Sequence, residues 1–480
     1  MKQLYTTLVL FLVVAAMGGW IYFREREPVA PSGSTVLLRL EPEKVSALTV
    51  RTQDGQRLEF SRKDADWRVQ SGGLQSLDFP ADAQQIQALL EALRLVESSA
   101  VIEDKAGADE LESYGLANPR SSLATGDAKI EFGNQPTFDV TQIYARVTSN
   151  FNRGGVSQIA LLPVQLAAFS LQSLDDWRDK SILNLEPKSV LRFSIQTPNA
   201  KIAFERDAQN QVGNSGEWKM NSPVRSLADA ALVTLFLQQI SQTKIKKFLE
   251  DAPKQKARWG LAQPQAKIEI AVAGKGSTSR ARALLIGKPV AGGMAAQNSA
   301  SSAVFVLPAE VMALVSRPLR DWRDKSVLKF NTGRLQTMKV LARGKQMEFE
   351  QIEGNWRRRD GENAKKYHAA ALEISFALQV IKATDLIDEP QNLNSFGLDK
   401  PVLQLQLTSE EWSGERTVQF GQANGKIYAR VVGQSGFSSV VLALPSEALD
   451  GFQISLNVMF SNSKPPQVSP QTKPPGAKSP

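Results

Sequence analysis

The chain repeats itself, and this internal repeat constrains its possible folds more than any other feature of the sequence. The string WRDKSIL at residues 177–183 returns as WRDKSVL at residues 322–328, an offset of 322 − 177 = 145. The strings LRLEP at 38–42 and LNLEP at 183–187 give the same offset, 183 − 38 = 145. Because two unrelated strings agree on one period, the repeat has to be the basis of any fold prediction.

A third string, aromatic-Gly-Leu-x-x-Pro, predicts three copies of the repeat. Its glycines and prolines are Gly115 and Pro119, Gly260 and Pro264, and Gly397 and Pro401. The offsets are 260 − 115 = 145 and 397 − 260 = 137, so the third copy is slightly shortened. A glycine before leucine, with proline further on, suits a turn that needs positive φ and then extended chain. These residues are therefore predicted to be structural.

Each copy shows the same order of local patterns. In the first copy, alternating apolar and polar residues on both sides of Asp54-Gly55 predict a β-hairpin, and a short strand with Trp67 follows. A single apolar stripe then predicts a helix that starts near Asp82 and packs onto the sheet, with the members Ile86, Leu89, Leu90, Leu93 and Val96. Later copies predict helices at about residues 227–240 and 369–381.

Further strands are predicted after the Gly-Leu-x-x-Pro turn, and a short helix over residues 166–177 closes the first copy. The second copy lacks the Ile-Tyr-Ala-Arg string found at 143–146 and 427–430, and its residues 292–302 predict a loop of small residues. Together these patterns predict an α+β fold of three tandem two-layer modules, each a mostly antiparallel sheet with helices on one face.

Residues 4–23 predict one N-terminal transmembrane helix, because about twenty uncharged, mostly apolar residues span the ~30 Å hydrocarbon core. Trp20 and Tyr22 lie near its end, where amphipathic rings prefer the membrane boundary. The alternative is a cleaved signal peptide, but its apolar core would be only about 7–15 residues long. We expect an uncleaved anchor. With three residues before it, the rest of the chain is expected on the periplasmic side of a bacterial inner membrane.

These observations give the following expected organisation of the chain: a cytoplasmic N-terminus (1–3), a transmembrane helix (4–23), a linker (24–37), three repeat modules (38–183, 184–328 and 329–460) and a Pro/Ser/Lys tail (461–480). The tail has no apolar face to bury and is expected to be disordered.

Composition excludes several kinds of chemistry. The chain has no cysteine, which rules out disulfides, thiolate catalysis, cysteine-ligated metals and lipoprotein attachment. Its single histidine, His368, is predicted at a helix start on the surface, and one histidine cannot form a two-histidine zinc motif. The net charge of +8 is spread along mixed-charge segments, so nucleic-acid binding is not expected. No cofactor or metal site is predicted.

The Trp-Arg-Asp residues of the repeated string are the most suggestive candidates for a site: Trp177, Arg178 and Asp179, with Trp322, Arg323 and Asp324. With the Lys and Ser that follow, they offer an acid, two bases and a hydroxyl together. The third copy lacks the string, however, and the simpler interpretation is that Trp anchors the closing helix while Arg and Asp pair or cap. Leu183 or Leu328 would then begin the next sheet. We therefore expect structural repeat motifs, and no enzyme.

The order of hairpin, Trp strand, helix, aromatic-Gly-Leu-x-x-Pro turn and closing Trp-Arg-Asp resembles the bacterial domain of unknown function family 4340, over about residues 38–460. The resemblance implies an N-terminal anchor and an auxiliary role beside gliding-motility-type ABC transport systems, and it implies no catalytic residues. The expected function is a membrane-anchored extracytoplasmic accessory or scaffold protein that contacts a membrane protein partner, such as ABC transporter subunits. The alternative is an envelope module that binds a lipid or glycan in a groove between modules.

Overall fold

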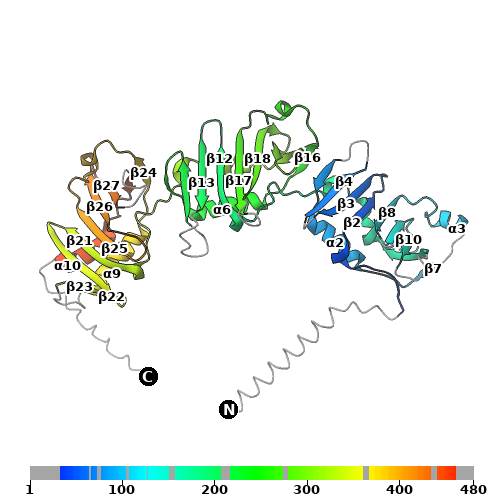
Figure 1. The fold of residues 1–480 in the computed structure, drawn as a ribbon, viewed down its shortest axis with the longest axis horizontal. Coiled ribbons are helices and arrows are strands. Elements are labelled where there is room, and N and C mark those ends of the chain that lie inside the picture. Colours follow the sequence, from blue (N-terminus) through cyan, green and yellow to red (C-terminus); the bar gives the residue numbers. More distant parts are fainter. Residues whose placement is uncertain are drawn as a thin grey trace, which may run out of the picture. The chain divides into compact units, whose positions relative to one another are not determined.

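The protein has an α+β fold in which antiparallel sheets carry helices (Figure 1). The structure is a computed structural model that describes residues 33–460, except 64–65, 73–76, 104–107, 127, 151–156, 207–216, 274–278, 361–366 and 434–439. Its described strands form one two-stranded sheet, two nine-stranded sheets and one eight-stranded sheet. The α+β class and the mostly antiparallel sheets predicted from the sequence are confirmed.

The first sheet has the strand order β5-β4-β3-β2-β8-β9-β10-β11-β7. Its strands are β2 (Ala47–Arg51), β3 (Arg57–Lys63), β4 (Asp66–Ser71), β5 (Asp78–Pro80), β7 (Val101–Glu103), β8 (Ser121–Thr125), β9 (Ala128–Phe132), β10 (Gln142–Ser149) and β11 (Ser157–Pro163). The helical segments of this region are η1 (Pro42–Lys44), α2 (Ala83–Arg94), α3 (Ala108–Ser113), α4 (Val164–Ala168), η2 (Phe169–Leu171) and α5 (Leu174–Trp177).

The second sheet has the order β15-β14-β13-β12-β17-β18-β19-β20-β16. Its strands are β12 (Val190–Gln196), β13 (Lys201–Arg206), β14 (Trp218–Ser222), β15 (Ser226–Leu227), β16 (Lys247–Glu250), β17 (Ala266–Ala273), β18 (Ser279–Val290), β19 (Gly293–Asn298) and β20 (Val304–Leu307). The helical segments here are η3 (Pro187–Ser189), α6 (Ala230–Gln242), η4 (Lys256–Trp259), α7 (Val311–Val315) and α8 (Leu319–Trp322).

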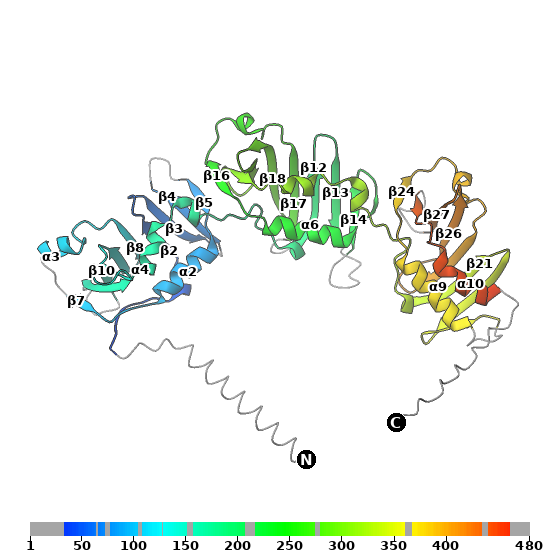
Figure 2. The same cartoon turned by 180° about the vertical axis from the view of Figure 1, so that it is seen from behind.

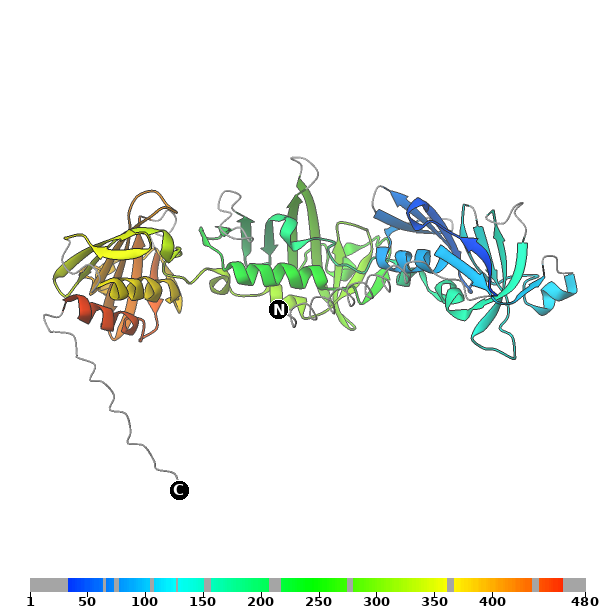
Figure 3. The ribbon, with the colours of Figure 1, turned by 90° about the horizontal axis from the view of Figure 1, so that it is seen from below.

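The third sheet has the order β23-β22-β21-β25-β26-β27-β28-β24. Its strands are β21 (Leu335–Ala342), β22 (Lys345–Ile352), β23 (Asn355–Arg358), β24 (Asp385–Asp388), β25 (Leu403–Ser409), β26 (Arg416–Ala423), β27 (Lys426–Val432) and β28 (Val440–Leu444). Its helical segments are η5 (Thr332–Arg334), α9 (His368–Val380), η7 (Leu393–Phe396) and α10 (Asp450–Phe460). Figure 3 shows α9 and α10 side by side on one face of this sheet.

The predicted hairpins and long helices are present. In the first hairpin, β2 pairs with β3 around Asp54-Gly55, and Val50 lies opposite Leu58. The helix α2 begins after Asp82, whose side chain accepts hydrogen bonds from the backbone N–H groups of Gln84 and Gln85. Four members of the predicted stripe are buried on α2, while the fifth, Val96, lies in the following strand. Figure 2 shows α2, α6 and α9 from behind, each beside its own sheet.

Three boundaries predicted from the sequence are wrong. The closing helix over 166–177 is broken into α4, η2 and α5. Leu183 is buried but lies outside any strand, and the second sheet begins at β12. Residues 35–37 of the expected linker belong to a strand instead, because β1 (Thr35–Arg39) pairs with β6 (Leu95–Ser98). The apolar and polar residues of β1 do not by themselves indicate that this segment pairs with β6.

The loop predicted over residues 292–302 is also wrong, since β19 occupies residues 293–298 and pairs with β20. Its small residues have a packing role. Ala295 and Ala296 are fully buried, and a Cβ at Gly293 would lie 2.0 Å from the backbone oxygen of Leu307. Small residues here indicate close approach of two backbones, not a flexible loop.

The chain divides into two compact units. One consists of Met1–Ile182, Lys244–Ala262 and Pro289–Pro308, and the other of Leu183–Thr243, Gln263–Lys288 and Ala309–Pro480. Within the described residues, no helix has both the length and the apolar character needed to cross a membrane. The transmembrane helix expected at 4–23, the N-terminus at 1–3 and the tail at 461–480 lie outside the described residues.

Candidate functional site

The three Gly-Leu-x-x-Pro turns share one backbone geometry. The glycines have the predicted positive φ, with values of +71° at Gly115, +72° at Gly260 and +67° at Gly397. Gly260 and Gly397 end the one-turn helices η4 and η7 in the left-handed conformation. The prolines that follow, Pro119, Pro264 and Pro401, each lie two residues before a strand: β8, β17 and β25. The motif therefore ends a turn of helix and starts a strand.

A close contact between two backbones explains why the third turn needs glycine. A Cβ at Gly397 would lie 2.5 Å from the backbone oxygen of Gln422 in β26. A Cβ at Gly421, in the same strand, would lie 2.3 Å from the oxygen of Phe396. The turn and the strand pack so closely that neither glycine leaves room for a ligand. The arrangement is structural.

The first Trp-Arg-Asp segment, residues 177–183, is held by backbone hydrogen bonds on two sides. On one side, the N–H of Asp82 donates to the carbonyl of Trp177 at 2.8 Å, and the N–H of Asp179 donates to Pro80 at 2.9 Å. On the other, the N–H of Ile245 donates to Lys180 at 2.6 Å. The segment thus connects the helix start before α2 with the chain that leads into β16.

Arg178 is the most enclosed cation of this segment, with a side chain that is 2% exposed. Its guanidinium lies between two rings, 3.9 Å from the centroid of Phe79 and 3.5 Å from that of Phe248. Nη1 donates to Asp251 at 2.6 Å and to Asp175 at 3.2 Å. A buried cation is tolerated only when it is paired in this way, so the arrangement binds the Arg side chain and not a substrate.

The second segment, residues 322–328, repeats the arrangement. Asp229 donates its N–H to Trp322 at 2.8 Å, and Ala383 donates to Lys325 at 2.6 Å. Arg323, 4% exposed at its side chain, makes two hydrogen bonds to Asp388, both of 2.8 Å. This fork-to-fork pair fixes the guanidinium in one plane.

The two aspartates of the strings turn the chain and do not pair with the adjacent arginines. Asp179 accepts the N–H of Ser181 at 2.8 Å, and Asp324 accepts the N–H of Ser326 at 2.9 Å. Upstream of the first segment, a hydrogen bond from Ser173 holds the pKa of Asp176 below its usual range. Trp177 and Trp322 are fully buried against Phe60 and Phe204 respectively.

His368 starts α9 as predicted, but it is half-buried and not a free surface residue. Its Nδ1 accepts the backbone N–H of Trp356 at 3.0 Å. This bond ties the helix to the edge strand β23, which is a structural use of the ring. Among the described residues, no group of three or more His, Asp or Glu side chains could hold a metal ion.

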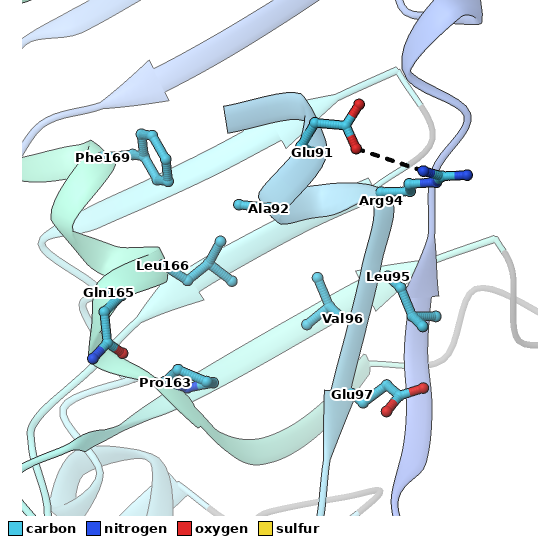
Figure 4. A pocket seen from close by; sticks show the side chains of 10 residues that line it. All are labelled: Glu91, Ala92, Arg94, Leu95, Val96, Glu97, Pro163, Gln165, Leu166 and Phe169. Carbon is cyan, nitrogen blue, oxygen red and sulfur yellow. Dashed lines mark ion pairs between the residues drawn. The ribbon is translucent and has the colours of Figure 1, made fainter. Parts of the chain in front are cut away.

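An open groove of about 1000 Å³ lies beside the C-terminal end of α2 (Figure 4). Residues of α2 and β6 form one wall, and residues at the end of β11, in α4 and in η2 form the other. The lining residues are Glu91, Ala92, Arg94, Leu95, Val96, Glu97, Pro163, Gln165, Leu166 and Phe169. Figure 4 shows Val96 and Leu166 pointing toward one another across the groove. Sequence reasoning missed this groove, because its two walls are about seventy residues apart in the chain.

Asp251 and Asp388, the acceptors for the two arginines, were also missed by sequence reasoning. A usable signal exists, since 388 − 251 = 137 is the same offset as 397 − 260 = 137. Asp388 directly follows the apolar pair Leu386-Ile387, and Asp251 follows Phe248-Leu249 after one residue, Glu250. Matching acidic positions across the second and third copies would have indicated a common partner for the repeated arginine.

Comparisons with known proteins give one informative match. The sequence model described as Domain of unknown function (DUF4340) matches residues 74–216 and 218–390. No curated protein matches the chain. Two matching solved structures are DNA polymerase sliding clamps from Pseudomonas aeruginosa, one bound to griselimycin and one with a ligand. Each has 10% sequence identity and covers 85% of this chain and 94% of the other, with TM-scores of 0.13 and 0.12. Scores this low do not indicate a shared fold.

Proposed function

The chain belongs to the DUF4340 family, and from this premise we propose that it is a membrane-anchored extracytoplasmic accessory or scaffold protein of a bacterial inner membrane. Residues 4–23 would be the anchor, and residues 38–460 would form three related modules in the periplasm. The corresponding strand orders of the three large sheets support the three-module organisation. The apolar composition of residues 4–23 supports the anchor.

The observation that carries this proposal is the use of the repeated Trp-Arg-Asp residues. Both arginines are buried and bound to aspartates, and both tryptophans are buried in cores. Residues that could have been catalytic are occupied in holding successive parts of the chain together. Because the charged residues of the repeat stabilise the fold, we expect the protein to act through contacts with other proteins.

The proposed partner is a membrane protein, with the subunits of an ABC transporter as the first candidates. This choice follows from the family resemblance and from the anchor, which would keep the modules beside membrane-embedded subunits. Exposed apolar side chains on the third module offer contact surface: Phe376 and Val380 on α9, and Ile454 and Val458 on α10. Such patches mark interaction surfaces in many proteins.

The test is site-specific photocrosslinking in native membranes. A photoreactive residue replaces Val380 or Ile454, which are 70% and 72% exposed. A matched control carries it at Gln379, a polar α9 residue beside Val380. We expect crosslinks to a membrane protein, identified by mass spectrometry, from the apolar positions and fewer from the control. Recovery of no membrane protein from any position would contradict the proposal.

The location is tested independently by protease treatment of spheroplasts. If the modules are periplasmic, protease added outside the cells should remove the C-terminal tail while a cytoplasmic marker stays intact. Protection of the tail in intact spheroplasts would refute the proposed orientation.

A second candidate function is lipid binding, and the groove beside α2 favours it over glycan binding. Six of its ten lining residues are apolar, namely Ala92, Leu95, Val96, Pro163, Leu166 and Phe169. Sugar-binding sites need many polar partners, which this groove does not supply.

A further inference from the structure

The groove beside α2 is apolar between its walls and charged at its rim. Val96 and Leu166, which face each other from the two walls, belong to the buried core of the first sheet, while Ala92 is exposed on α2. The rim carries Glu91, Arg94 and Glu97. Ligand sites are typically concave and apolar with a few polar groups at defined positions, and the groove has that composition.

The described part of the chain begins at this rim. Ser34 donates its hydroxyl to Glu97 Oε2 at 3.1 Å, and β1 runs antiparallel to β6 with Thr35 opposite Ser98. The residues from Arg24 to Ser34 number 34 − 24 + 1 = 11. At ~3.3–3.6 Å per residue they reach at most about 40 Å from the end of the proposed anchor. The groove is therefore confined to the neighbourhood of the membrane surface.

One polar atom of the groove lacks a partner. Glu97 Oε1 is buried and accepts no hydrogen bond from the described residues. A buried carboxylate oxygen is costly to leave unpaired, and because this one has almost no accessible surface, a ligand donor reaches it only when the Glu97 side chain turns outward at the rim. Arg94 lies three residues before Glu97 in the chain. Its side chain is 58% exposed, and its guanidinium forms an ion pair of 3.7 Å with Glu91. An ammonium donor and a phosphate would match this acid and this base.

We propose that the groove holds one acyl chain of a phospholipid from the membrane in which the chain is anchored. The acyl chain of the lipid contacts Val96 and Leu166, and the headgroup of the lipid contacts Glu97 and Arg94 at the rim. This inference rests on the anchor of the proposed function, because the anchor supplies the lipid. A peptide is the competing kind of ligand, and the experiment separates the two.

The test uses the full-length chain in vesicles of phosphatidylethanolamine and phosphatidylglycerol that contain a phosphatidylethanolamine with a diazirine on one acyl chain. After illumination, labelled peptides are mapped by mass spectrometry. We expect labelling of residues 91–97 and 163–169, and separately of residues 4–23. Labelling of 4–23 reports on the anchor, and labelling of the groove peptides reports on the site. The two proposals can therefore fail independently.

Two variants fill the groove from opposite walls without removing a core side chain: Ala92→Trp on α2 and Gln165→Trp on α4, both at exposed positions. The matched control is Ala88→Trp, which is exposed on α2 one turn earlier and does not line the groove. We expect both variants to lose the labelling of the groove peptides and to keep that of 4–23. The control should keep both.

Three outcomes would overturn the inference. One is labelling of 4–23 with none in the groove. Another is groove labelling that survives both tryptophan variants. The third is labelling spread equally over exposed apolar residues elsewhere, such as Phe138 and Val380, which would show nonspecific contact. Groove labelling that an excess of unlabelled lipid leaves unchanged, but that an added soluble peptide removes, would assign the groove to a peptide.

Discussion

Replacing Asp388 by alanine should loosen the chain around the second Trp-Arg-Asp segment far more than replacing Asp251 loosens the first. Both aspartates bind a buried arginine. Arg323, however, has Asp388 as its single acidic partner among the described residues, through two bonds of 2.8 Å. Arg178 would keep Asp175 at 3.2 Å and the rings of Phe79 and Phe248. The two variants therefore leave their arginines in different environments.

The magnitudes follow from these contacts. Leaving a buried charge without its partner costs about 3–5 kcal/mol. The Asp388 side chain is 40% exposed, so water reaches the vacated position and reduces this to about 2–3 kcal/mol. For Asp251→Ala the remaining carboxylate and the two rings reduce the loss to about 1 kcal/mol. Since 1.4 kcal/mol is about tenfold, Asp388→Ala should accelerate local opening by roughly 30–150-fold and Asp251→Ala by about fivefold.

Hydrogen exchange followed by mass spectrometry measures these openings. The reporter amides are those of Ala383, which donates to Lys325, and Ile245, which donates to Lys180. Asp385→Ala is the matched control, because Asp385 is exposed on the same strand β24 and, within the described part of the chain, its carboxylate accepts only the adjacent N–H of Leu386. Equal acceleration by Asp388→Ala and Asp251→Ala, or less than about threefold for Asp388→Ala, would refute the reasoning.

Two further predictions concern stability. Gly397→Ala should cost more than about 3 kcal/mol in urea unfolding followed by tryptophan fluorescence, because its Cβ would lie 2.5 Å from Gln422 O. Gly425→Ala, with φ of +72° and open space around it, should cost only about 1 kcal/mol, and equal costs would contradict the close-packing argument. Burial raises the pKa of Glu131, but hydrogen bonds and charges from Lys129 and Arg146 outweigh it and hold that pKa below its usual range. The ionised carboxylate thus stabilises the fold above the unfolded-state pKa of about 4.3, and the contribution is lost as pH falls through the lower folded-state value. Wild type should lose more stability than Glu131→Gln between about pH 5 and pH 2, and parallel pH profiles would disprove the pairing.

Local patterns predicted the parts of the fold whose causes are local. Asp82 caps α2 because a short carboxylate beside free N–H groups does so in any context. The glycines of the turns have positive φ because that conformation is costly for other residues. Residues 293–298 were missed because small residues occur both in loops and in strands packed closely against another backbone. Only the position of Leu307 decides between these two.

The candidate site depended on long-range contacts to a greater degree. The sequence singled out Arg178 and Asp179 and predicted only that such residues pair or cap. The Arg178 guanidinium binds Asp251, 73 residues away. Spacing within one copy contains no information about that partner. The groove beside α2 is likewise made by chain segments whose local patterns predict only a helix end and a strand end. Comparing the copies with each other identifies the aspartate partners of the repeated arginines, but it does not identify the groove.

The double attachment of residues 177–183 bears on how such a chain could lengthen during evolution. These residues complete the packing around Phe60 and also carry the hydrogen bond from Ile245. An in-frame duplication of 145 residues that includes residues 177–183 or 322–328 would therefore produce one more intact segment. The C-terminal helix α10 has no Trp-Arg-Asp string, so a copy appended after Phe460 would have nothing to attach to. Growth by internal duplication is the route that this architecture leaves open.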